Sequence, residues 1–361
     1  YTNKYMGNPA GSISSLSNRD LTWETNYNTN IGLDFSLFNQ RLRGSVEYFN
    51  RKSDNLLQDV PVSMVTGFSS TLKNIGRINN HGVEIELSGD IIRKNGLTWS
   101  ASANAALISS KVKKLYRGED IIWYDPTGGD SRAQYVYREG ESTLAFYGYE
   151  WAGVDPANGK SVYYVNDESD PQAGDFTFNG RGATYDYNKA NYKIIGNGIA
   201  DVTGGFSTNV NYRGLEFGLN FIYKIGGSLY DGAYKDVADD GYYWERIRSK
   251  HYYENMWTPT HTNASEPALS GSDLTDAIQY SSRHLHNASF LRLKTMTLAY
   301  TLPKAWTSHA MMTRARVFFN AENLLTFSCY KDADPEVNSY STRGWETPIG
   351  KTFVFGIELT L

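Results

Sequence analysis

The sequence predicts an all-β protein built on one large antiparallel sheet, with the lengths and faces of a transmembrane β-barrel. Residues 202–212 and 215–225 form two runs in which apolar and polar residues alternate, and Arg213-Gly214 joins them as a two-residue hairpin turn. Each run has about 11 residues, whereas soluble strands usually have about 5–6 and a tilted membrane-spanning strand needs roughly 9–11. In a barrel of this kind the apolar face meets lipid and the polar face lines a wet lumen.

The composition is compatible with a barrel and excludes several other classes. The 361 residues include 27 Tyr and 33 Gly, but only 10 Pro and one Cys, Cys329. A single Cys excludes an internal disulfide framework and a Cys-based zinc site. No run of about 18 apolar residues occurs, so no transmembrane helix is expected. The net charge of −4 and the absence of a long basic run argue against nucleic acid as a partner.

Taken in order, the chain has about eleven segments with strand-like alternation, beginning with the longest, from Trp23 to Leu37. In the strand at 290–302 the phase is open, because Arg292 and Lys294 share the parity of the apolar Met296 and Leu298. The expected strands span residues 23–37, 42–48, 83–88, 97–107, 147–151, 162–165, 202–212, 215–225, 290–302, 314–327 and 353–361.

Short and long connections alternate along this series. The short turns lie near residues 39, 94, 157, 213 and 308, and the mostly long connections span 59–71, 114–142, 167–199, 230–287 and 328–349. Outer-membrane barrels have short periplasmic turns and long external loops. We therefore expect one end of the molecule to carry Trp123, Trp244 and Trp257, and the other to carry Asn39, Asn95, Asn158 and Arg213. The last strand would then run inward, which places the C-terminus in the periplasm.

Three linked motifs occur along the chain. They are Leu21-Thr22-Trp23-Glu24 followed by residues 29–34, Ala288-Ser289-Phe290-Leu291-Arg292-Leu293-Lys294 continuing to Tyr300-Thr301-Leu302-Pro303, and Asn323-Leu324-Leu325-Thr326-Phe327 followed by Asp334-Pro335-Glu336-Val337. Together they resemble the late barrel of SusC/RagA-type TonB-dependent transporters. The resemblance extends from about Leu21 to Leu361. It implies a large barrel in the bacterial outer membrane with its long loops outside.

The resemblance also implies a larger protein and a function. Transporters of this type close with about 22 strands around a plug. Eleven strands, no plug-like segment and a start at Tyr-Thr-Asn lead us to interpret residues 1–361 as the C-terminal part of the barrel domain. The implied function is active uptake of a nutrient such as an oligosaccharide or a peptide. The implied partners are a SusD-like lipoprotein lid, the TonB complex through the missing N-terminal part, the N-terminal barrel and plug portion of the same protein, and outer-membrane lipid and lipopolysaccharide.

Aromatic residues of the long loops are the candidate substrate contacts, because a flat apolar ring with a polar edge suits sugars and peptide side chains. The candidates are Trp123, Tyr124, Tyr243, Trp244, Trp257 and Trp345. Such rings would equally serve to hold loops together or to sit at the membrane interface. His284-x-His286 and Asp332-x-Asp334-x-Glu336 have spacings compatible with a metal, but the sequence shows no further ligands, so no metal or other cofactor is expected.

Two other classes of function stay open at this point. One is a passive porin or a surface ligand-binding barrel, which needs neither a plug nor energy coupling. The other is a soluble β-sandwich that binds carbohydrate. An enzyme is not expected, because the sequence contains no nucleophile-elbow, zinc-protease or phosphate-loop motif. Fractionation of the full-length protein would separate the soluble alternative from both barrels.

Overall fold

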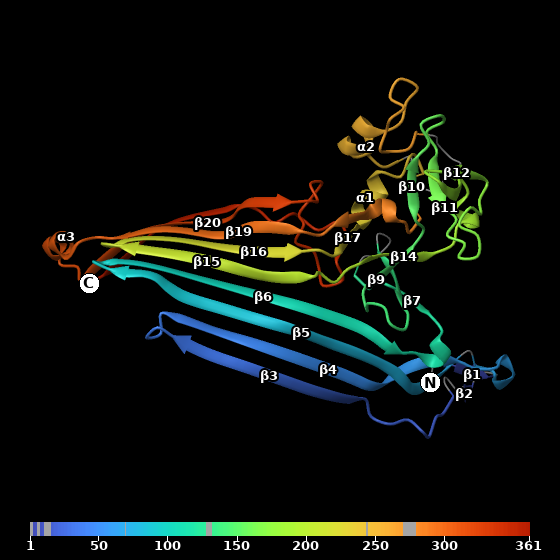
Figure 1. Ribbon diagram of the computed structural model, residues 1–361, viewed down its shortest axis with the longest axis horizontal. Helices are drawn as coiled ribbons and strands as arrows, with labels where there is room; N and C mark the ends of the chain where they lie inside the picture. Colours follow the sequence, from blue (N-terminus) through green and yellow to red (C-terminus); the bar gives the residue numbers. More distant parts are fainter. Residues whose placement is uncertain are drawn as a thin grey trace.

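The computed structural model describes residues 3–5, 8–10, 16–68, 70–127, 132–242, 245–269 and 279–361. A long twisted sheet makes up most of the molecule, and a compact assembly of loops lies at one end of it (Figure 1). Within the described residues, no helix is both long enough and apolar enough to cross a membrane.

The large sheet has nine strands in the order β22-β20-β19-β16-β15-β6-β5-β4-β3 within the described residues. All of its neighbouring strands are antiparallel, which confirms the all-β antiparallel fold. Within the described residues the sheet does not close on itself. The strands are β3 (Thr25–Leu37), β4 (Leu42–Pro61), β5 (Ser70–Lys94), β6 (Leu97–Lys114), β15 (Val202–Tyr212), β16 (Leu215–Ile225), β19 (Phe290–Thr301), β20 (Arg314–Ser328) and β22 (Thr352–Thr360).

The smaller elements belong to the loops and turns. Three small sheets have the orders β14-β9-β8-β7, β10-β11-β13-β12 and β18-β17-β21. Their strands are β7 (Ile121–Tyr124), β8 (Gln134–Tyr137), β9 (Ala145–Gly148), β10 (Trp151–Val154), β11 (Ser161–Tyr164), β12 (Phe176–Phe178), β13 (Arg181–Thr184), β14 (Lys193–Asn197), β17 (Ser228–Asp231), β18 (Leu285–Asn287) and β21 (Thr342–Arg343), and β1 (Asn3–Tyr5) pairs with β2 (Asn8–Ala10). The α-helices are α1 (Gly232–Val237), α2 (Lys250–Asn255) and α3 (Lys304–Thr307), and the 3₁₀ turns are Met64–Thr66, Tyr116–Gly118, Tyr187–Lys189, Ser282–His284 and Ser308–Ala310.

The expected number of long strands is too high by two. The segments 147–151 and 162–165 lie in β9, β10 and β11, which belong to the small sheets of the loop assembly. The turn between β10 and β11 contains Asn158, and it lies beside Trp257, whose Nε1 donates to the carbonyl oxygen of Pro156 at 3.0 Å. The expectation that Asn158 and Trp257 lie at opposite ends is therefore wrong. Four alternating residues carry the same sequence signal in a loop sheet as in a barrel wall.

The other short turns lie as expected. The β3–β4, β5–β6 and β15–β16 turns, which contain Asn39, Asn95 and Arg213, are at the end opposite to β7 and α2 (Figure 1). These three residues have positive φ angles of 55°, 53° and 46°, as tight hairpin turns require. Trp123 is in β7 and Trp257 follows α2, whereas Trp244 lies outside the described residues.

The two faces of the sheet differ in chemistry along continuous rows of paired residues. One row reads Trp99, Val210, Phe217, Leu298, Phe319, Phe355 across six strands. A row on the other face reads Ser88, Ser102, Ser207, Asn220, Thr295, Glu322, Thr352. Phe355 is 78% exposed, and an apolar surface that spans a whole sheet is far larger than monomeric soluble proteins expose. The apolar face therefore has the character of a lipid-facing barrel wall.

A β-bulge settles the phase of β19. Thr295 lies opposite Asn220 on β16, but the next pair joins Leu293 to Phe221, so Lys294 is skipped. The bulge shifts the alternation by one residue. Above it Leu293 takes the apolar face, and Arg292 lies opposite Ile222 on the polar face. Arg292 therefore does not lie on the apolar face of Met296 and Leu298, although its number has the same parity, and Lys294 lies at the bulge itself.

We predict that substitution by Arg lowers the stability of the full-length protein much more at Phe221 than at the adjacent Asn220. Phe221→Arg places a charge in hydrocarbon and should cost about 2–4 kcal/mol near the midplane. Asn220→Arg lies on the wet face opposite Ser207 and Thr295 and should cost little. Urea unfolding in lipid bilayers measures both.

Phe221→Leu is the control for a buried core. The Phe221 ring stacks on Phe206 with centroids 4.7 Å apart, so its loss should remove about 1 kcal/mol of aromatic pairing. A loss of about 3 kcal/mol or more would indicate a protein core behind this face and would contradict the lipid-facing assignment.

Candidate functional site

The loop between β20 and β22, residues 329–351, connects the other long loops, and we refer to it as the hub loop. Its backbone at Tyr340 accepts a hydrogen bond from the Tyr135 hydroxyl at 2.5 Å. Its Ser341 hydroxyl donates to the carbonyl of Ser228 at 2.9 Å. Its β21 strand pairs in parallel with β17. These contacts reach two segments that are more than one hundred residues away in sequence, so the hub loop organises this end of the molecule.

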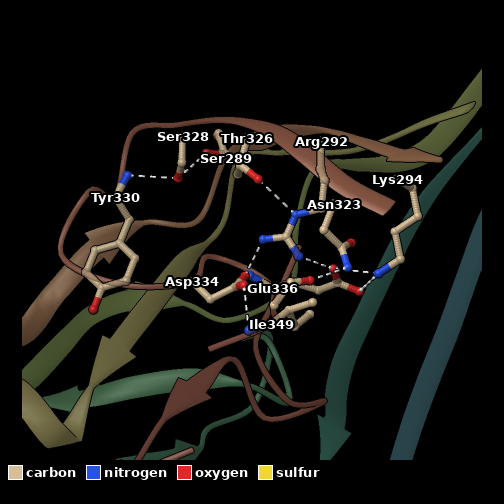
Figure 2. Close-up of polar contacts among 11 residues, drawn as sticks. Ser289, Arg292, Lys294, Asn323, Thr326, Ser328, Tyr330, Asp334, Glu336 and Ile349 are labelled. Carbon is tan, nitrogen blue, oxygen red and sulfur yellow. Dashed lines mark hydrogen bonds and ion pairs between the residues drawn. The ribbon is translucent and has the colours of Figure 1, made fainter. Parts of the chain in front are cut away.

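An ionic cluster fixes the hub loop to the wall. The Arg292 side chain is 2% exposed and donates to Glu336 Oε2 at 2.7 Å, to the Thr326 hydroxyl at 3.1 Å and to Asp334. Lys294 Nζ donates to the same Glu336 carboxylate at 3.1 Å. Figure 2 shows the guanidinium enclosed by these groups. The bulge at Lys294 makes the contact possible, because it turns Arg292 to the polar face.

A second group of contacts, centred on the buried Asp231, joins the hub loop to helix α1. Asp231 accepts from Arg343 Nη1 at 2.9 Å and from the Tyr330 hydroxyl, and its Oδ1 also caps the helix by accepting from the Tyr234 N–H at 2.8 Å. Burial and the Asp231 charge raise the pKa of Tyr330 well above its usual range, so it stays a hydrogen-bond donor. A fully buried carboxylate is stable here because several donors share its charge.

Aromatic rings form the apolar core of the loop assembly. Tyr135 stacks on Trp123 with centroids 4.3 Å apart and on Phe146 at 4.9 Å, and Phe146 stacks on Tyr230 at 6.1 Å. Tyr340 of the hub loop packs against this cluster. The loops therefore enclose an interior of their own.

The structure separates the six candidate substrate contacts into three groups. Trp123 packs in the aromatic core, and Trp257 packs against Gly159 and donates to the Pro156 carbonyl, so both hold loops together. Tyr124 is 38% exposed, with the Arg132 guanidinium 4.5 Å from its ring centre, and Trp345 on the hub loop is 65% exposed. Tyr243 and Trp244 lie outside the described residues.

The two motifs with metal-compatible spacing make contacts with other side chains. Asp334 and Glu336 bind Arg292 and Lys294, and His286 lies against the Tyr330 ring with centroids 4.9 Å apart. Across the described part of the chain, no group of three or more His, Cys, Asp or Glu side chains is arranged to hold a metal ion.

A polar hollow of about 300 Å³ opens between two of the small sheets, and its lining includes Arg138, Arg181 and Lys193. Arg181 donates twice to Glu150, at 3.0 and 2.8 Å, and Lys193 donates to the same carboxylate at 3.0 Å. The hydrogen bond from Arg181 is the main reason that the pKa of Glu150 is lowered. This hollow can hold a polar ligand. The sequence offered no signal for it, because its cations come from three segments.

We predict that Arg292→Met in the full-length protein releases the hub loop. The substitution leaves the Asp334 side chain, which is 15% exposed, without its cation, and breaking a buried pair costs up to about 3–5 kcal/mol. Hydrogen exchange of residues 329–351 should accelerate while that of β15 and β16 stays unchanged. The control is Arg93→Gln, because the Arg93 side chain is 74% exposed beside Asp90 and such pairs contribute about 0–1 kcal/mol. Equal exchange in both variants would contradict the anchoring role of Arg292.

We also predict that the loop assembly loosens in mild acid. Burial lowers the pKa of His286 against the opposing effects of Asp231, Asp332 and Glu266, and nearby His251 lowers it further. Because the folded pKa lies below the unfolded value of 6.5, the unfolded loops bind the proton more readily, so stability present above pH 6.5 is lost as the pH falls below it.

Exchange rates of β18 and the hub loop, corrected for intrinsic pH effects, measure this dependence. His286→Phe should flatten it, and His309→Phe at the opposite end should not. An unchanged pH profile in His286→Phe would assign the dependence to other groups.

Comparisons with known proteins agree with this architecture. The family model described as TonB dependent receptor-like, beta-barrel matches residues 1–324. TonB-dependent receptor P3 of Formosa agariphila is 31% identical over 335 residues, which cover 90% of this chain and 32% of that protein. TonB-dependent receptor SusC of Bacteroides thetaiotaomicron is 27% identical over 350 residues, which cover 95% of this chain and 32% of that protein.

A solved structure of the RagAB peptide transporter superposes with a TM-score of 0.78 and 30% identity over 99% of this chain and 38% of that one. The chain thus spans about a third of the length of the curated relatives it matches. Because the family model covers most of its length, the chain belongs to the TonB-dependent receptor β-barrel family, whose members are barrel proteins of the outer membrane.

Proposed function

We propose that residues 1–361 form the C-terminal part of the barrel of an active importer, which takes up a nutrient, an oligosaccharide or a peptide, across the bacterial outer membrane. The observation that carries the proposal is the nine-stranded sheet with one apolar and one polar face, joined at one end to a folded loop assembly. A lipid-facing wall with a polar inner face is the architecture of a conduit. The N-terminal barrel strands and plug of the same protein would complete it.

The orientation and partners follow from the same proposal. The loop assembly faces the cell exterior, and the short turns and the C-terminus face the periplasm, as in other outer-membrane barrels. The TonB complex supplies energy through the N-terminal part, and a SusD-like lipoprotein covers the loops. The likeness to SusC and to the RagAB transporter supports this partnership. The family is one of receptors, which supports a role in transport.

Trp345 and Tyr124 are the best-placed substrate contacts of the described candidates. Both expose ring surface, whereas Trp123 and Trp257 are engaged in packing. Trp345 Nε1 donates to Asp236 at 3.3 Å, which steadies the indole and leaves a face free. An exposed, steadied ring is a suitable platform for a sugar ring or a peptide side chain.

Uptake by cells that produce the full-length protein tests the proposal. Labelled oligosaccharides and labelled peptides are offered separately, with and without an active TonB system. We expect accumulation of one class to require both the protein and TonB. Uptake that continues without TonB would favour a passive porin, and a full-length protein found in the soluble fraction would contradict both barrel functions.

Within the same assay we expect Trp345→Ala to raise the half-saturating substrate concentration several-fold, because one stacking contact of about 1 kcal/mol is lost. Trp306→Ala is the matched control, since that exposed tryptophan lies in α3 at the opposite end. An equal effect of the two substitutions would remove Trp345 from the substrate path.

A further inference from the structure

A groove opens in the wall where strand β6 leaves strand β15. The two strands pair only as far as Ala106 and Thr203. Beyond that point, residues 107–111 face residues 197–201 across a hollow of about 420 Å³. Tyr48, Val83 and Leu107 provide apolar lining and lie opposite one another in register.

The apolar lining of this groove belongs to the lipid-facing side of the sheet. Leu107 and Ala103 are four residues apart on β6, so their side chains share a face. Ala103 pairs with Phe206, and Phe206 pairs with Phe221. The groove is therefore continuous with the apolar surface of the wall and is accessible to a hydrocarbon chain from the bilayer.

Cationic side chains follow at the loop end of the same groove. Four residues beyond the row of Tyr48 and Val83, which is about 13 Å along a strand, the row reads Lys52, Asn79, Lys111. Lys111 lines the groove itself. Lys113 and Lys114 follow, and Lys114 lies directly opposite Arg77. A pair of like charges at facing positions is unfavourable unless an anion is shared.

An acidic side chain neutralises one end of this row, because Asp54 binds both Lys52, at 2.7 Å, and Arg77. Lys111, Lys113 and Lys114 are exposed, and none of them forms an ion pair with another described residue. Asp201 also lines the groove, so an anionic ligand would bind toward the lysine end.

We propose that the groove and the cationic row form a binding site for lipopolysaccharide of the outer leaflet. An acyl chain fills the groove beside Tyr48, Val83 and Leu107, and a phosphate group accepts hydrogen bonds from Lys111 and the lysines beyond it. Such charge-assisted bonds favour phosphate over a neutral headgroup. The assignment to lipopolysaccharide rests on the proposed orientation of the loops, because this end of the wall then lies in the outer leaflet.

The test uses the full-length protein in detergent and measures binding of lipopolysaccharide, the same material after phosphate removal, and phosphatidylglycerol. The triple variant Lys111→Gln, Lys113→Gln, Lys114→Gln should bind lipopolysaccharide about tenfold or more weakly, since hydrogen bonds to a charged group are lost. Wild-type protein should bind the dephosphorylated form as weakly. Leu107→Trp, which fills the groove, should also weaken binding. The matched control, Arg93→Gln with Lys94→Gln, lies at the other end of β5 and should change nothing.

Unchanged binding by the triple variant would overturn the proposal, and so would equally tight binding of phosphatidylglycerol. A parallel labelling experiment separates this failure from failure of the proposed orientation. Tyr253→Cys in α2 and Trp306→Cys in α3, which are exposed at opposite ends of the molecule, are each made in a Cys329→Ser background and treated on whole cells with a membrane-impermeant maleimide. If Tyr253→Cys is labelled and Trp306→Cys is not, the orientation holds, and unchanged lipopolysaccharide binding by the triple variant then rejects the lipid site alone. Labelling of Trp306→Cys alone would reject the orientation on which the site rests.

Discussion

The rest of the structure depends on the hydrogen-bond ladder of the barrel wall. In hydrocarbon an unpaired backbone group costs several kcal/mol, so every spanning strand must pair along its length. Each strand from β3 to β22 is paired with its neighbours in the sheet, and this pairing fixes which side chains share a face. Beyond the groove at residues 107–109, residues 140–143 resume the pairing with β6, as in the bonds from Val112 N to the Glu141 carbonyl and from Thr143 N to the Ser110 carbonyl. Register shifts occur within the wall as well, including one between Asp90 and Ile92 near the short β5–β6 turn.

The bulge in β19 shows how one irregularity connects the wall to the loops. By skipping Lys294, the strand keeps its apolar residues toward lipid and turns Arg292 inward, where Asp334 and Glu336 approach it. The neighbouring strand β20 accommodates the change of register at Asn323, which has a φ of 53°. The side-chain amide of Asn323 donates to the Gly350 carbonyl at 3.1 Å. A local change of register thus anchors a loop more than twenty residues long.

Sequence reasoning located all nine long strands by their period-two patterns, but it gave two of them too short. It expected strands at 42–48 and 83–88, whereas β4 and β5 extend over Leu42–Pro61 and Ser70–Lys94. It added two strands at 147–151 and 162–165, since short aromatic alternation is the same in a loop sheet. The partners of Arg292 could not be read, because Asp334 lies 42 residues away and only the fold joins them. The sequence nevertheless indicated the bulge, because Arg292 shares the even-numbered parity of the apolar Met296 and Leu298. Among the candidate aromatics, a tryptophan in the core, such as Trp123, and one on the surface, such as Trp345, have the same sequence signature.

The loop assembly combines its aromatic core with buried charges, and this choice bears on function. Arg283 is fully enclosed and donates to Glu266 at 2.7 Å and to the Ala238 carbonyl at 2.7 Å. A buried pair of this kind adds little net stability, but removing either partner is severely unfavourable. Alternative loop packings would separate Arg283 from Glu266, or Arg343 from Asp231, and each separation would leave a buried charge without its partner. The free-energy cost of an unpaired buried charge favours one arrangement of the loops. The exposed ring of Trp345 is therefore held by an ordered loop assembly.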